Sequence, residues 1–306
     1  MKLGRIILIG LALFLMSGPA WASPYATTLV DSGGTFGPSP YNDPASVLGA
    51  PATDFYDPWG SWSGGDNYRK VKLVEPAYNY APDQTTKLIT TLRNPSYIVV
   101  GFDHQVMNDQ NNPYGIDFLV FGNAFYVGSG FVNDETNMAT YMLVGGAFTE
   151  NVLVSVSQGP AYEGQPQNEW TWYTYSNGPY GDNAFPTQAY EWDQAKYDAT
   201  GNGWTDDLMD FTKPVNPAYY DTLMAGGLSG AAGIALYEGS GGGTGFDLDV
   251  FGLDWIQYIK VEGTADFKEG EIDAFADVAP VPVPGAVLLL GGGLLRLMAW
   301  RRQRTN

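Results

Sequence analysis

The chain has 306 residues, with 33 acidic residues, 15 basic residues and no cysteine, which gives a formal net charge of −18. This charge disfavours binding to nucleic acids or anionic lipid surfaces, and the lack of cysteine excludes disulfides and thiolate metal sites. Two basic residues precede residue 23 and four follow residue 280. Residues 23–280 therefore hold nine basic residues and carry a formal charge of −24.

The first 22 residues have the pattern of a secretory signal peptide. Lys2 and Arg5 precede an apolar run over residues 6–16, and a small-residue site follows it. We expect signal peptidase to cut between Ala22 and Ser23. The chain is thus predicted to be exported.

Residues 23–280 are predicted to form one all-β domain. Short runs of β-branched and aromatic residues alternate with Gly, Pro, Asn and Asp clusters, a pattern typical of strands and turns. The expected strands are 70–75, 97–103, 116–121, 151–157, 170–175, 246–251, 255–261 and 271–275. Valines at alternate positions of 151–157 predict one apolar and one mostly polar face. We expect a single antiparallel β-sandwich with long loops and a flexible turn at the Gly-rich 239–245. Only 221–225 and a few acidic-aromatic patches suggest helix.

Catalytic arrangements have little support in the sequence. His104 is the only histidine, so a multi-histidine zinc site is excluded, and a Ser-His-Asp mechanism would depend on this one residue. A loop histidine with no catalytic role is the simpler interpretation. Glycoside hydrolysis needs only two carboxylates, which so acidic a chain can always supply, so it is neither excluded nor supported. We expect a non-enzymatic protein.

Calcium is the cofactor that the sequence best supports. The segment 198–207 places oxygen side chains with the spacing of an EF-hand loop, and Gly203 stands at its sixth position. The candidate ligands are Asp198, Thr200, Asn202 and Asp206. Met209 occupies the twelfth position, where a bidentate acid should close the shell, and an ordinary turn explains the same residues.

Two further groups of acids are candidate calcium ligands. Asp109 lies in an Asn-rich loop near Asp117. Asp247 and Asp249 are expected on one face of a strand, where Glu271 or Asp273 from a neighbouring strand could join them. Exposed polar positions on an outer sheet face explain this pattern equally well.

An aromatic-rich stretch over 162–197 is the candidate ligand surface. Exposed aromatic rings beside amides and carboxylates suit sugar rings, which have flat apolar faces and a rim of hydroxyls. Tyr180, Tyr190 and Trp192 are the candidate carbohydrate-binding residues, because they follow the strand 170–175 in a Gly- and Pro-rich loop. Trp170 and Trp172 are expected to pack mainly in the core.

The C-terminal residues have the pattern of a membrane-targeted tail. Pro282 and Pro284 precede an apolar run over 286–300, and Arg301 and Arg302 follow it directly. The run is shorter than the ~20 residues of a relaxed spanning helix, and basic residues behind an apolar segment mark its cytoplasmic side.

This layout resembles the PEP-CTERM sorting signal, with Pro282-Val-Pro284 in place of Pro-Glu-Pro and Arg296 interrupting the apolar run. The resemblance implies recognition by an exosortase, a transient inner-membrane precursor, and cleavage of the tail. A plain anchor that is retained is the alternative. The expected organisation is a signal peptide over 1–22, a β-sandwich over 23–280 and a sorting signal over 281–306.

Four stretches of the body resemble bacterial cell-surface proteins with galactose-binding-like jelly rolls. They are 48–51, 115–125, 152–157 followed by Trp170, and 245–249 followed by 256–261. Gly122 stands where that pattern carries Glu. The resemblance implies a jelly-roll fold at the surface or in the extracellular matrix of a Gram-negative bacterium. Association with extracellular polysaccharide is the expected function; a purely structural or adhesive matrix protein and a carbohydrate-active hydrolase or lyase are the alternatives.

Overall fold

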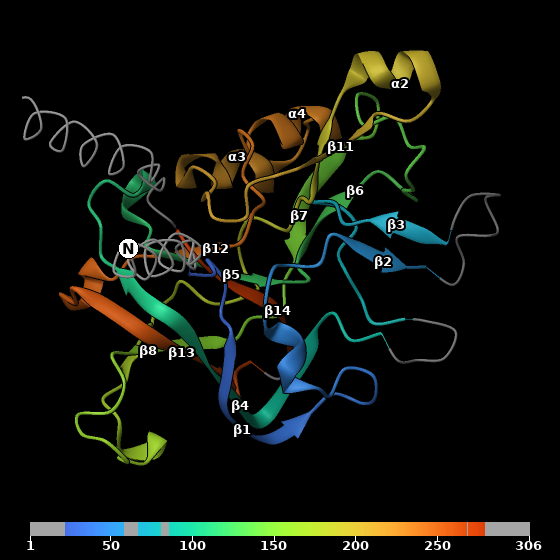
Figure 1. Cartoon of the computed structure of the whole chain (residues 1–306). Coiled ribbons are helices and arrows are strands. Elements are labelled where there is room, and N and C mark those ends of the chain that lie inside the picture. The colour runs from blue at the N-terminus through green and yellow to red at the C-terminus, as the bar shows by residue number, and fades with distance from the viewer. Residues whose placement is uncertain (1–21, 58–66, 81–85, 268, 279–306) are drawn as a thin grey trace, which may run out of the picture.

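The computed structural model describes residues 22–57, 67–80, 86–267 and 269–278 (Figure 1). The expected sorting signal over 281–306 lies outside these ranges, as does the expected signal peptide apart from its last residue, Ala22. Within the described ranges, no helix is both long and apolar enough to cross a membrane.

The described chain is mostly β, and a curled antiparallel sheet of eight strands forms its centre (Figure 1). Its path runs β12-β5-β14-β4-β13-β8-β9, with β1 paired to β4. The strands are β1 (Thr28–Phe36), β4 (Thr90–Met107), β5 (Phe118–Gly122), β8 (Leu153–Ser157), β9 (Tyr173–Thr174), β12 (Thr244–Phe246), β13 (Trp255–Gly263) and β14 (Glu269–Asp277).

The long strand β4 connects the two halves of this sheet. Its residues 90–93 pair with β14, whereas residues 96–107 pair with β13. The partner changes at Asn94 and Pro95, where proline cannot donate a ladder hydrogen bond. One strand thus serves both halves, which allows the sheet to curl around a shared apolar core.

Smaller elements lie beside the sheet. Three two-stranded ribbons pair β2 (Asp54–Tyr56) with β3 (Tyr68–Lys70), β6 (Phe125–Gly128) with β7 (Leu143–Phe148), and β10 (Tyr190–Trp192) with β11 (Trp204–Leu208). The α-helices are α2 (Gln194–Thr200), α3 (Tyr220–Ala225) and α4 (Gly230–Ala235). The 3-10 helices are η1 (Pro44–Val47), η3 (Pro113–Gly115), η4 (Gln167–Glu169), η5 (Pro217–Tyr219) and η6 (Asp249–Phe251).

Apolar side chains form three clusters. The largest is built from alternate residues of β4, β8 and β13 with aromatic residues such as Phe118 and Phe246. A second lies around Leu119, Phe121 and Ala274, which β5 and β14 turn in the opposite direction. The third is beneath α3, α4 and the ribbons β6–β7 and β10–β11. Because β5 and β14 contribute to different clusters from their two faces, neither face of β5 is polar.

Most predicted strands are confirmed, and the errors have physical causes. The segments 97–103, 116–121, 151–157, 255–261 and 271–275 all overlap strands of the main sheet, and 221–225 is helical. The prediction of a strand over 246–251 is wrong after Phe246, because the chain turns there into η6. Only Tyr173 and Thr174 of 170–175 pair as strand, and residues 72–75 form a turn.

Two polar or Gly-rich segments are packed inside the fold. Ser155 and Ser157 lie on the face of β8 predicted to be mostly polar, and both are buried. The run 239–245 leads into the strand β12 as expected: Gly241 packs against the ring of Phe211, and Gly242 packs against backbone. Glycine is needed there because a β-carbon would collide with these neighbours.

Candidate functional site

Two indole rings lie together over the outward face of β13. The ring centroids of Trp170 and Trp172 are 6.0 Å apart with 20° between their planes. Trp170 packs on Tyr258 with centroids 4.5 Å apart, and the Lys260 Nζ lies 5.2 Å from the centre of the Trp172 ring. We call Trp170, Trp172 and Tyr258 the indole platform. Both indoles are half-buried, so part of each ring remains accessible.

Alternation along β13 explains why the platform faces outward. Ile259 and Val261 enter the main core, which turns Tyr258 and Lys260 to the opposite face. The chain between β8 and β9 then lays the indoles over these side chains. Residue 159 is glycine with φ of 101°, and a β-carbon there would strike the Tyr258 ring.

Hydrogen bonds within the same excursion fix the two indoles. The Nε1 of Trp170 donates to the carbonyl of Gln165 at 3.1 Å, and that of Trp172 donates to the carbonyl of Gln167 at 3.4 Å. The hydroxyls of Ser155 and Thr174 are 2.9 Å apart and tie β9 to β8. The platform is therefore pre-formed.

The expected carbohydrate-binding residues fall into two different surroundings. Tyr190 and Trp192 lie on β10 with one residue between them. Tyr180 instead packs against Phe267 with ring centroids 4.7 Å apart and donates to the Ser176 carbonyl at 3.3 Å. These contacts do not bring the three rings onto one surface.

The two rings of β10 are already engaged by protein groups. The Tyr190 hydroxyl donates to Asp54 at 2.6 Å. Burial is the main cause, and this hydrogen bond the second, that raises the pKa of Tyr190 to about 12. The Lys70 Nζ lies 3.6 Å from the centre of the Tyr190 ring. Trp192 packs against Trp204 with centroids 4.9 Å apart. Both rings are half-buried, as the indoles of the platform are.

The expected calcium loop forms the end of a helix and the turn after it. Asp198 and Thr200 lie in α2, which ends at Gly201 in the left-handed conformation. The Thr200 hydroxyl donates to the Lys196 carbonyl at 2.7 Å, and the Asn202 Oδ1 accepts from the Trp204 amide at 3.0 Å. Asp206 follows on β11 and is exposed. Side-chain oxygens here are used to cap the helix and shape the turn.

Asp109 and Asp117 are brought together, but by backbone donors. The Asp117 Oδ1 accepts from the Asp109 amide at 3.1 Å, and its Oδ2 accepts from the Leu248 amide at 2.9 Å. Burial raises the pKa of Asp117, and the negative charge of Asp247 adds to this effect. The hydrogen bonds oppose it without reversing it. Asp117 thus links its own loop to the turn after β12.

Asp247 and Asp249 do not share one face of a strand, which corrects the sequence expectation. They lie in the turn leading into η6, where the Asp247 Oδ1 accepts from the Asp249 amide at 2.7 Å. Asp273 accepts from the Ala52 amide at 2.8 Å, and Glu271 contacts Thr91 and Asn123. Neither joins the pair. Across the parts of the chain that are described, no three His, Asp or Glu side chains are placed to hold a metal ion.

No motif in the sequence indicates the acidic cluster formed by Glu150, Asp182 and Glu271. Asp182 is 2% exposed, and its Oδ1 accepts from the Ala124 amide at 2.6 Å. Glu271 accepts from the Thr91 hydroxyl at 2.6 Å and from the Asn123 amide. Glu150 also lines a cleft of about 480 Å³ with Asp266, Phe267 and Glu269.

Burial and mutual repulsion dominate the electrostatics of this acidic cluster. Burial, with repulsion from Glu271 and Glu269, raises the pKa of Glu150 to about 7. Burial also raises the pKa of Glu271, and it raises the pKa of Asp182 far above the ordinary value. The three members lie far apart in the sequence, so this group is recognised only in the folded structure.

Gly122 explains how Asp182 enters the cluster. A β-carbon at Gly122 would collide with the carboxylate of Asp182 and with the carbonyl of Glu271. The Asp182 carboxylate therefore occupies the volume that a side chain at 122 would need. A larger side chain such as glutamate has no room at position 122.

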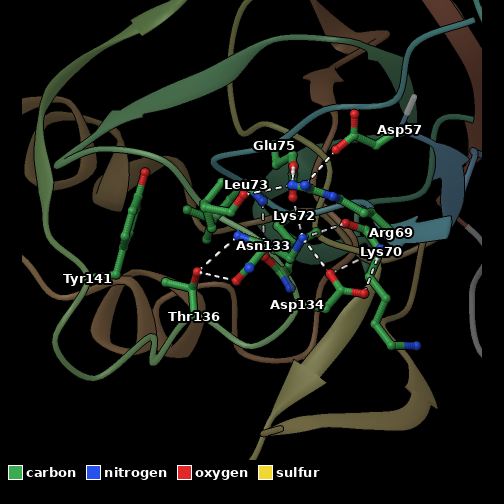
Figure 2. Close-up of polar contacts among 12 residues, drawn as sticks. Asp57, Arg69, Lys70, Lys72, Leu73, Glu75, Asn133, Asp134, Thr136 and Tyr141 are labelled. Atoms are coloured by element: carbon green, nitrogen blue, oxygen red, sulfur yellow. Dashed lines mark hydrogen bonds and ion pairs between the residues drawn. The ribbon is translucent and has the colours of Figure 1, made fainter. Parts of the chain in front are cut away.

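A second buried group of charges is fully paired. Figure 2 shows Arg69 and Lys72 pointing toward the shared Glu75. Arg69 lies 2.5 Å from Asp57 and 2.7 Å from Glu75, while Lys72 lies 2.8 Å from Asp134 and also contacts Glu75. We call these five residues the buried ion network.

The contacts of the buried ion network indicate a structural role. Lys72 is fully buried, and its third donor contact is with the Lys70 carbonyl at 2.9 Å. Arg69 also donates to the Val132 carbonyl at 2.8 Å. Because the Lys72 ammonium has three acceptors, none of its donors is free. The network fastens the segment 131–136 to β3.

His104 bridges two carboxylates at the other end of the sheet. Its Nδ1 lies 2.9 Å from Asp103, and its Nε2 lies 2.9 Å from Asp277. Burial opposes the charged imidazole, but the two carboxylates outweigh it and raise the pKa of His104. The arrangement ties β4 to the end of β14. The described part of the chain has no serine hydrogen-bonded to this histidine, as a Ser-His-Asp arrangement would require.

Comparison with known proteins leaves the family open. No protein-family model matches the chain, and no curated protein matches it in sequence.

Proposed function

We propose that this chain is an exported, non-enzymatic protein of the cell surface or extracellular matrix that associates with polysaccharide through the indole platform. The near-parallel, half-exposed indoles of Trp170 and Trp172 are the observation that supports binding. The leader pattern before Ser23 and the tail from Pro282 to Arg302 support export and sorting by an exosortase-type signal. The resulting location is the outside of a Gram-negative cell.

The chemistry of the platform favours a neutral sugar polymer. Indole faces bury the apolar C–H faces of sugar rings, and the binding needs no opposite charge. The Lys260 and Glu262 side chains, 2.9 Å apart beside the platform, offer donors and acceptors for hydroxyls. A body with formal charge −24 repels anionic polymers, so a neutral glycan fits better.

The proposed fold class is a galactose-binding-like jelly roll. A curled antiparallel sheet with a shared core and long loops supports it. In such a fold, a rigid sheet carries binding residues on the loops and strands at its surface. Fold alone does not assign a ligand, so the proposal depends on the platform.

The test compares retention of variants on neutral polysaccharides by affinity electrophoresis. Trp172→Ala and the double variant Trp170→Ala/Trp172→Ala should migrate freely through a gel that retards wild type, with unchanged circular dichroism. The matched comparison is the triple variant Tyr180→Ala/Tyr190→Ala/Trp192→Ala. Loss of retention in the triple variant alone would move the site to the residues favoured by sequence. Retention of all variants like wild type would refute polysaccharide binding by aromatic rings.

An adhesive matrix protein is the second candidate, and the ribbon β6–β7 favours it. The outer face of this ribbon exposes Val127, Val144 and Phe148 by 40%, 56% and 50%, and Phe125 stacks on Phe148 with centroids 5.3 Å apart. Contiguous exposed apolar side chains commonly mark contact surfaces. Sedimentation velocity with Val144→Glu tests it: salt-dependent self-association that the variant abolishes would support this candidate.

A further inference from the structure

Two buried oxygen atoms in the acidic cluster have no hydrogen-bond donor. They are the Oδ2 of Asp182 and the Oδ1 of Asn123. Asn123 uses its amide nitrogen to donate to Glu271, which leaves its oxygen as the unpaired atom. A buried acceptor without a partner costs about 1–3 kcal/mol, and a charged one costs more. Both unpaired atoms of the cluster are acceptors, so each lacks a hydrogen-bond donor or a cation.

The protein supplies no cationic side chain for this cluster within the part of the chain that is described. Glu150, Asp182 and Glu271 take part in none of the ion pairs there, and the nearby Glu269 pairs with Arg93 at 3.2 Å. The buried ion network shows the contrast, because each of its carboxylates faces Arg or Lys. Uncompensated carboxylates are unusual in a protein interior.

The local backbone is built to hold the Asp182 carboxylate in this place. Asp182 has a φ of 54°, a conformation uncommon for residues with a side chain. Gly122 has no β-carbon, and one would collide with the Asp182 carboxylate. Consecutive residues then anchor the acids, since Asn123 donates to Glu271 and the Ala124 amide donates to Asp182.

We propose that the acidic cluster binds one divalent metal cation, with Ca²⁺ preferred, through Asp182 Oδ2, Asn123 Oδ1 and the Glu271 carboxylate. All three ligands are oxygens, which Ca²⁺ prefers, and its shell of 6–8 ligands is completed by backbone carbonyls and water. Each Glu271 oxygen has only one donor, so each retains acceptor capacity. Glu150 adds negative potential and faces a solvent-accessible cleft. This site is separate from the segment 198–206.

The proposal competes with a cluster that holds a bound proton instead of a metal. The calcium response of wild type separates the two, and the variant Asp182→Asn is its metal-free reference, because Asn keeps the size of the side chain and an acceptor for the Ala124 amide. Its new NH₂ group can donate to an unpaired oxygen of the cluster, so the variant should fold without metal. We expect it to melt in EDTA at or above the temperature of wild type.

The decisive measurement is thermal unfolding of the purified chain in EDTA, in millimolar CaCl₂ and in millimolar MgCl₂, with calorimetric titration of CaCl₂. Wild type should gain melting temperature in CaCl₂ and bind one equivalent of Ca²⁺. Asp182→Asn should lose this gain, and its affinity for Ca²⁺ should fall by more than the roughly 10- to 100-fold expected for loss of a partner that does not touch the metal. Glu271→Gln should behave in the same direction.

Two variants serve as matched controls. Asp273→Asn alters a buried carboxylate on the same strand that accepts only from the Ala52 amide, and it should keep the calcium response. Asp206→Asn alters the segment that sequence favoured. Loss of the response in Asp206→Asn with its retention in Asp182→Asn would overturn the proposal. Identical melting of wild type in EDTA and CaCl₂ would overturn it as well and assign a proton to the cluster.

Discussion

The carboxylate of Asp182 fills the space where a side chain at Gly122 would lie. We expect Gly122→Ala to destabilise the fold by about 1–3 kcal/mol, since the new methyl group overlaps both this carboxylate and the Glu271 carbonyl. Denaturant unfolding measures the loss. Asp182→Gly, which suits the positive φ, should recover part of it in the double variant, because one of the two collisions is removed. Additive losses would show that the two residues do not compete for the same volume.

Removing a cation from the buried ion network should cost far more than removing one from the surface. Lys72→Met leaves Asp134 without its cation, and unfolding free energy should fall by about 3–5 kcal/mol. Lys87→Met breaks a pair with Asp43 whose side chains are 46% and 32% exposed, so its cost should stay within about 1 kcal/mol. Equal losses in the two variants, measured by urea unfolding, would contradict a structural role for the network.

The His104 bridge should stabilise the fold at mildly acidic pH. Asp103 and Asp277 raise the pKa of His104 above its unfolded value, so protonation favours the folded state. The contribution is complete below the unfolded pKa of about 6.5 and is lost as pH rises through the folded pKa. The change amounts to about 1.4 kcal/mol for each unit of pKa elevation.

The measurement for His104 is the difference between wild type and His104→Gln at several pH values. His104 contacts Asp103, Asp277 and the ring of Phe102. The backbone nitrogen of Ser23 donates to Asp103, and the charge of Asp117 acts on Asp277. Subtraction removes the titration of other buried acids such as Glu150. The difference should shrink from pH 5.5 to pH 8.5; a constant or growing difference would exclude a charged bridge.

Processing of the two ends should be visible in the intact mass of the protein recovered from its cells. Mature protein is expected to begin at Ser23 and to end near Pro284, without the apolar tail. Pro282→Ala/Pro284→Ala should leave an uncleaved precursor in the inner membrane, because recognition is expected to need the extended Pro-x-Pro conformation. Wild-type protein ending at Asn306 would instead establish a retained anchor.

The sequence alone determined the β class and most strands of the main sheet. Alternation of Val152, Val154 and Val156 reports burial directly, since successive side chains on a strand face opposite ways. Patterns in short stretches of sequence failed to predict structure where contacts between distant residues decide it. The EF-hand-like spacing of 198–206 does not distinguish a loop from the helix end at Gly201, because the same Asn, Gly and Thr residues cap helices and shape turns.

Tertiary structure alone brought together Glu150, Asp182 and Glu271, and it placed two indoles over Tyr258. The members of each group come from separate strands and loops, and no spacing in the sequence encodes their convergence. Alternation in 170–175 predicted that some rings are buried but not which surface the others cover. The curl of the sheet and the packing of glycine against side chains, as at Gly122, bring the members of each group together. Both depend on the folded chain as a whole.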